Sequence, residues 1–342
     1  MSAFNELAMT PYAAAMLARL IDQVRLDGLR DVTPAVGLGW VVTEPTRKAI
    51  SVLDHNLQLL GRVPIDLTGS RIAVAAAGSF IAASDSNEIA VLEGTGKTCW
   101  RKAWDRSAGA SRGDGPSLHI DADGVLWIRV EQALLALDVK SGKEIHRVPL
   151  AGPDAALFLP RPADSRTGLA LLHPDPSPSA LISLVNDHIV LQPLIGLDTA
   201  SFSPAGSQYL TMTTDGFLSV REVATEAVRV WRHLDDLPDL PSDLIGASFA
   251  SWATFLNEDL VLASVGIPEA SDNPEEHLLL SARSLRCRSR VRYPGIADPG
   301  SIVACQQPGR WLTHEHEAKT LRLWQLGDRL DDEPLPGQLH LL

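Results

Sequence analysis

The chain has 342 residues, of which 45% are hydrophobic and 21% are charged, and its formal net charge is −12. This composition excludes a disordered chain, and no apolar run approaches the ~20 residues that a membrane-spanning helix needs. The acidic charge also argues against nucleic acid as a partner.

The first segment is expected to form a short amphipathic helix. Thr10 and Pro11 have the residue types of a helix N-cap and first helical position. Apolar residues, among them Met16 and Leu20, then recur at helical spacing and form one stripe. This stripe predicts either packing on the rest of the protein or a surface for a partner, which includes a homodimer formed through the helix.

A repeat follows the helix and predicts the fold. Each copy has an alternating apolar strand, a polar hinge and a second apolar strand, and the copies recur about every 40 residues with one longer gap. The first strands of the seven copies lie at residues 50–54, 89–93, 134–138, 181–184, 218–222, 278–283 and 321–325. Two more short strands precede each copy, so we expect an all-β, seven-bladed β-propeller of four-stranded blades.

The repeat also sets the expected boundaries. We expect a helical extension over residues 1–32 and a propeller over residues 33–342. The last blade has no obvious fourth strand after Gln325. Because a propeller must close to protect its edges, we expect either the tail 338–342 or the segment before residue 33 to supply that strand.

Several blades resemble known propeller families. Residues 202–210, Phe-Ser-Pro-Ala-Gly-Ser-Gln-Tyr-Leu, and the strand ends at Trp231 and Trp324 resemble WD-repeat blades. Residues 92–97 and 136–143 resemble blades of quinoprotein-like propellers. The resemblance spans roughly residues 33–330 and implies a seven-bladed propeller. Residues 123–127, Asp-Gly-Val-Leu-Trp, resemble one blade of the streptogramin-lyase-like propellers.

Histidines provide the candidates for metal binding. His314 and His316 alternate along an expected strand, so they share one face and could form half of a metal site. The alternative is a pair of solvated residues at the rim of the last blade. His119 lies near Asp121 and is either a metal ligand at the channel mouth or a hydrogen-bonded structural residue. We predict no cofactor and no catalytic residue, because the expected inner strands carry few acids, bases or metal ligands.

Charged stripes provide the candidates for partner binding. Four arginines alternate along one expected strand and share a face: Arg286, Arg288, Arg290 and Arg292. They could bind an acidic partner, or they could protect the strand from edge pairing. An insertion over residues 268–276, which ends in Glu275 and Glu276, is expected to form an exposed loop of the type that binds partners.

These features favour a non-catalytic scaffold that binds a protein or peptide through its loop faces or its N-terminal helix. The alternative is a metal-assisted lyase or hydrolase at the channel mouth, with His119, His314 or His316 as candidate ligands. The cysteines have no disulfide spacing and no signal-peptide pattern is present, so we expect a cytoplasmic location without a membrane partner.

Overall fold

The computed structural model describes residues 15–44, 48–67, 72–104, 117–130, 133–150, 156–160, 167–171, 179–194, 199–213, 216–266, 275–296 and 298–329. The regular structure of these residues is 28 β-strands and two single-turn 3-10 helices, Leu234–Asp236 and Ser242–Leu244. The prediction of an all-β protein is therefore confirmed.

The strands form seven antiparallel units of four, and in the first six units the four strands are consecutive in the chain. Unit 1 consists of β2 (Val32–Val36), β3 (Gly39–Glu44), β4 (Ala49–Asp54) and β5 (Leu59–Pro64). Unit 2 consists of β6 (Ala73–Ala77), β7 (Phe80–Ser84), β8 (Glu88–Glu93) and β9 (Thr98–Ala103). Unit 3 consists of β10 (Ser117–Ile120), β11 (Val125–Val130), β12 (Ala133–Asp138) and β13 (Glu144–Pro149).

The second half of the chain repeats this arrangement. Unit 4 consists of β14 (Ala156–Pro160), β15 (Thr167–Leu171), β16 (Ser179–Val185) and β17 (His188–Leu194). Unit 5 consists of β18 (Thr199–Phe202), β19 (Gln208–Met212), β20 (Phe217–Glu222) and β21 (Val228–His233). Unit 6 consists of β22 (Ser248–Asn257), β23 (Leu260–Gly266), β24 (Glu276–Ser281) and β25 (Cys287–Arg292). Unit 7 consists of β26 (Ser301–Gln307), β27 (Arg310–Glu315), β28 (Thr320–Arg329) and the first strand of the chain, β1 (Met16–Arg25).

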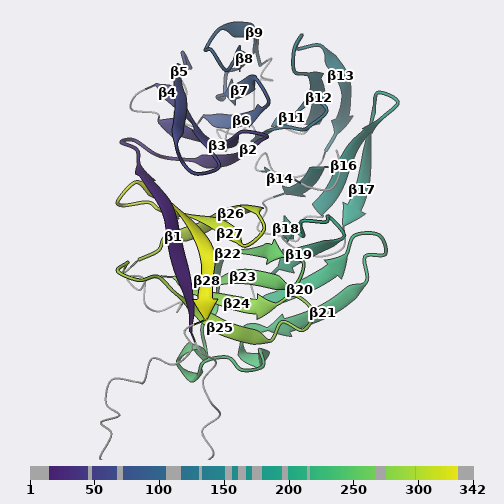
Figure 1. Ribbon diagram of the computed structural model, residues 1–342. Helices are drawn as coiled ribbons and strands as arrows, with labels where there is room; N and C mark the ends of the chain where they lie inside the picture. Colours follow the sequence, from purple (N-terminus) through teal and green to yellow (C-terminus); the bar gives the residue numbers. More distant parts are fainter. Residues whose placement is uncertain are drawn as a thin grey trace, which may run out of the picture.

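The first strands of the units meet in a closed order. β2 contacts β6, and the contacts continue through β10, β14, β18, β22 and β26 back to β2. Figure 1 shows these strands toward the middle of the molecule, with outer strands such as β9, β13, β17 and β21 at its periphery. Short parallel pairings, between β2 and β6 and between β1 and β25, also join neighbouring units. The last unit therefore lies against the first.

Apolar clusters fill the contacts between neighbouring units. The described residues contain seven such clusters, and each combines side chains of two adjacent units. Between units 7 and 1, for example, Trp40 and Val42 pack with Leu312 and Leu323. Every residue of β3 is buried, whereas β5 at the edge of the same unit is largely exposed. A sheet that is covered on both faces needs apolar residues at successive positions, and the middle strands have them.

The prediction of an N-terminal helix is wrong for residues 16–25, which form β1. Two register shifts interrupt its pairing with β28, and its apolar residues pack on both faces of unit 7. Ala18 packs on the side of unit 6, whereas Ile21 and Val24 pack on the side of unit 1. Bulges and burial on two faces thus produce a three-residue spacing that resembles a helix turn. Thr10 and Pro11, the predicted cap, lie outside the described residues.

β1 is the strand that completes the last unit, so the segment before residue 33 supplies it. It runs antiparallel to β28, with Arg19 opposite Gln325 and Val24 opposite Leu321. Gly327 allows this approach, because a Cβ atom at that position would lie 2.7 Å from the carbonyl oxygen of Leu17. The alternative closing segment, residues 338–342, lies outside the described part of the chain.

Candidate functional site

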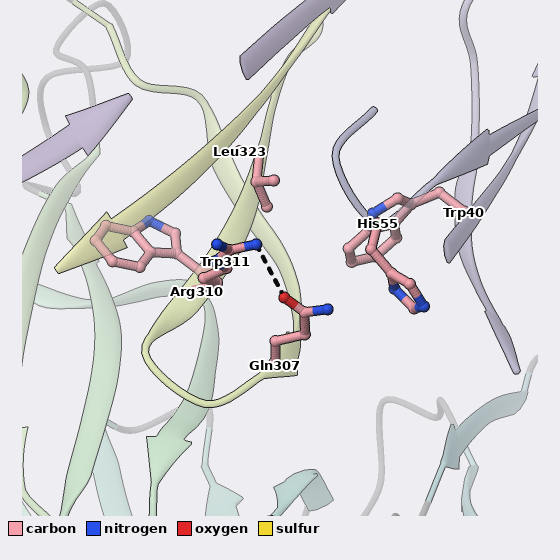
Figure 2. Close-up of a pocket in the computed structure, with 6 residues that line it drawn as sticks. All are labelled: Trp40, His55, Gln307, Arg310, Trp311 and Leu323. Atoms are coloured by element: carbon pink, nitrogen blue, oxygen red, sulfur yellow. Dashed lines mark hydrogen bonds between the residues drawn. The ribbon is translucent and has the colours of Figure 1, made fainter. Parts of the chain in front are cut away.

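A shallow pocket with a cavity volume of about 10 Å³, open in part to solvent, lies where unit 1 meets unit 7 (Figure 2). Its lining residues come from positions far apart in the sequence: Trp40, His55, Gln307, Arg310, Trp311 and Leu323. Figure 2 shows the two side chains of unit 1 on one side and those of unit 7 across from them. The pocket therefore exists only because the first and last units are neighbours.

Two turns place the polar side chains at this pocket. The carboxylate of Asp54 accepts hydrogen bonds from the backbone N–H groups of Asn56 and Gln58, both at 2.8 Å. This Asx-type turn carries His55 at its tip. On the opposite side, the tight β26–β27 turn has Gly309 at φ 75° and places Arg310 beside Gln307. Residues that favour turns, Asp54 on one side and Gly309 on the other, thus position both sides of the pocket.

The pocket is rich in hydrogen-bond donors. Arg310 donates from Nη1 to the side-chain oxygens of Gln307 at 3.1 Å and Asn56 at 3.4 Å. These neutral partners hold the guanidinium between the two units, and no carboxylate pairs with it among the residues that the structure describes. The positive charge is therefore available to a ligand.

Two buried nitrogen atoms line the same pocket without a partner. Trp40 is only 2% exposed, and its Nε1 has no hydrogen-bond partner within the described ranges. The same holds for Nδ1 of His55. In Figure 2 the indole nitrogen of Trp40 faces the unit 7 side of the pocket. A buried N–H group that lacks an acceptor costs roughly 1–3 kcal/mol, so a bound acceptor would recover that free energy.

The predicted pair of histidines does come together. The ring centroids of His314 and His316 are 3.9 Å apart. His314 is buried, and this burial, with a smaller effect of His316, lowers its pKa to about 4. Its Nε2 has no partner among the residues described. Among all the residues that the structure describes, no group of three or more His, Cys, Asp or Glu side chains could hold a metal ion.

His119 lies in unit 3, away from this pair in the fold, and packs against unit 4. It is buried, its ring stacks on Phe158 with centroids 6.0 Å apart, and burial lowers its pKa to about 4. Asp121 accepts hydrogen bonds from the backbone N–H of Val125 at 2.9 Å and from Nε1 of Trp127 at 2.8 Å. Asp121 therefore holds the β10–β11 turn together.

The arginine stripe lies on β25 and on the residue before it, Arg286, and it faces an acidic loop of the same chain. Arg286 pairs with Asp239, and Arg290 pairs with Asp243 at 2.7 Å. Arg290 also pairs with Glu276 at 2.9 Å. Half of the stripe is thus neutralised within the protein, in contacts that the sequence pattern did not indicate.

The other residues that were predicted to bind a partner lie partly on the surface and partly in the interior. Arg288 and Arg292 are exposed on β25. Glu275 accepts hydrogen bonds from the hydroxyl groups of Ser264 and Ser301. Met16 packs between units 6 and 7, whereas Leu20 is 39% exposed. Most of the predicted insertion, residues 268–274, lies outside the described residues.

Sequence reasoning missed the pocket. Trp40 and Arg310 belong to no common motif, and only closure of the ring of units brings them together. The signal that could have indicated it was the missing fourth strand of the last repeat.

Comparisons with known proteins add no relative. No family model matches the chain, and no curated protein matches it. Among the described residues, no helix is long and apolar enough to cross a membrane.

Proposed function

We propose that the chain is a seven-bladed β-propeller, related to the WD-repeat and quinoprotein-like propellers, that works as a non-catalytic scaffold for a protein or peptide partner. Seven four-stranded units, the closed order of their first strands and the apolar cluster at each contact support the propeller. A propeller does not by itself define a function. The binding role is argued from the site.

The observation that carries the binding role is the donor-rich pocket between units 1 and 7. It combines the partly exposed Arg310 with the buried, unpartnered Nε1 of Trp40. Some of the other buried polar groups have structural roles. The carboxylate of Glu44, for example, accepts hydrogen bonds from Ser51 and Arg62, and Asp121 holds a turn.

The free thiol groups of the chain support a cytoplasmic location. Cys99 and Cys287 are free, and burial raises the pKa of Cys287 to about 11. A buried thiol with a raised pKa is a poor nucleophile and behaves as a small apolar side chain.

The scaffold proposal is tested by affinity capture from native lysate. We expect the wild-type chain to enrich a specific protein, and we expect an Arg310→Gln variant to lose most of that enrichment. Arg101→Gln is the matched control, because Arg101 lies on β9, in a different unit. Capture of no protein by the wild-type chain would contradict the scaffold role.

The alternative, a metal-assisted lyase or hydrolase, is favoured by the contact of His314 with His316. Metal analysis of the purified protein separates the two proposals. One equivalent of metal that is lost in both the His314→Ala and the His316→Ala variant would support the enzyme and argue against the scaffold.

A further inference from the structure

We propose that the pocket between units 1 and 7 binds a carboxylate group, presented by an acidic side chain or by the C-terminus of the partner. This inference rests on the proposed scaffold function. It assigns the pocket residues Trp40, His55 and Arg310 to recognition of the ligand.

The hydrogen-bond donors of the pocket determine the charge of the ligand and the type of atom that binds. The indole Nε1–H of Trp40 can only donate a hydrogen bond, and a guanidinium has donors but no acceptor. The matching ligand group is therefore an oxygen acceptor. Because both hydrogen bonds of Arg310 to the protein come from Nη1, the guanidinium is anchored on one side. A carboxylate is the planar anion that fits its remaining N–H groups.

The burial of the donors strengthens this match. Trp40 is 2% exposed and its nitrogen lacks a partner among the described residues, so the indole N–H gains a full hydrogen bond when a ligand oxygen arrives. The His55 ring adds a third donor in the tautomer that carries hydrogen on Nδ1.

The remaining lining residues argue against a metal ion. No lining residue is acidic, and the charge of Arg310 repels cations. Leu323 is buried beside Trp40 in the cluster between units 7 and 1, whereas the ring of Trp311 packs on the unit 6 side of unit 7.

Indole N–H resonances provide the test. The full-length chain is labelled with ¹⁵N-tryptophan, and the Trp40 signal is assigned from a Trp40→Phe variant among the eight tryptophans. One peptide carries a glutamate and an amidated C-terminus, and a second carries a free C-terminus without acidic side chains. A glutamine analogue of the first peptide and inorganic phosphate serve as comparison ligands at constant ionic strength.

We expect a carboxylate peptide to shift the Trp40 signal saturably, with a dissociation constant on the order of millimolar. The peptide that binds more tightly identifies the source of the carboxylate. Arg310→Gln is expected to weaken binding about 10- to 100-fold, whereas Arg101→Gln leaves it unchanged. Unchanged signals from the other seven tryptophans show that a variant remains folded.

Two results would overturn the inference. One is a Trp40 signal that does not respond to either carboxylate peptide. The other is binding of phosphate or of the glutamine analogue that is as tight as binding of the carboxylates. If affinity capture still enriches a partner with the Arg310→Gln variant, the scaffold role survives and only the carboxylate site fails.

Discussion

A chain that begins at residue 26 is expected to unfold at least ~10 °C below a chain that begins at residue 15, or to lose its cooperative transition. The shorter chain lacks β1, in which eight residues pair with β28. Its removal would expose the edge of β28 and uncover Trp324, which is 1% exposed in the complete unit. An uncovered apolar edge strand also promotes aggregation.

The comparison of these two chains isolates the contribution of β1. Both lack residues 1–14, and they differ only in residues 15–25. Thermal unfolding followed by circular dichroism, together with light scattering at the same protein concentration, measures the difference. Equal midpoints of thermal unfolding for the two chains would show that the stability of unit 7 does not depend on β1.

Acidification from pH 7 to pH 4 is expected to destabilise the protein strongly, through His119 and His277 in addition to His314. Burial lowers the pKa of His119 to about 4 and that of His277 to about 3, whereas both titrate near 6.5 in the unfolded chain. Between those values the unfolded state binds more protons than the folded state. The contribution of these two histidines to the free energy of unfolding is therefore fully present above about pH 6.5, and it is lost as the pH drops toward 4.

Burial lowers the pKa of His277, and the contacts of its ring fit the neutral form. The hydroxyl of Tyr293 accepts a hydrogen bond from Nε1 of Trp311 at 3.2 Å and contacts Nδ1 of His277. These contacts suit a neutral imidazole whose Nδ1 accepts a hydrogen bond from the tyrosine hydroxyl. Each histidine is expected to contribute on the order of 3 kcal/mol to the loss, which is a large share of the ~5–15 kcal/mol of a typical domain.

Urea unfolding at pH 7, 6, 5 and 4 tests this pH dependence. The wild-type midpoint is expected to fall steeply, whereas a His119→Gln, His277→Gln variant starts lower at pH 7 and falls less. Because the isoelectric point is near 5.3, the measurements need low protein concentration. Parallel curves for the wild type and the variant would assign the acid sensitivity to other groups.

The strands of the repeat could be predicted from the sequence because their signals are local. The first strands of the second and third copies, expected at residues 89–93 and 134–138, correspond to β8 and β12 within one residue at each end. Alternating apolar residues and polar hinges depend only on which face of a unit is covered. The order of contacts between units then follows from the repeat itself.

Other features depend on contacts that join distant residues, and the sequence pattern does not carry them. β1 has the apolar spacing of a helix because it is bulged and packs on both faces. The ion pairs of Arg286 and Arg290 with the loop at residues 239–243 link positions 47 apart. The contact of His314 with His316 could be predicted, because the two histidines alternate along the expected strand.

The central claim is that the first strand of the chain completes its last unit. Only residues 26–31 connect β1 to β2, so this pairing forces unit 1 beside unit 7 and creates the pocket. The direct test is a cysteine pair at Arg19 and Gln325, which face each other across β1 and β28. A pair at Gln23 and Gln325, four residues out of register, is the control.

Under mild oxidation, with the disulfides mapped by mass spectrometry, the Arg19→Cys, Gln325→Cys chain is expected to cross-link almost completely within one molecule. The Gln23→Cys, Gln325→Cys chain is expected to remain reduced, because four residues along a strand exceed the ~7 Å between Cα atoms that a disulfide spans. Failure of the first pair, or equal cross-linking of both, would contradict closure of the ring by β1.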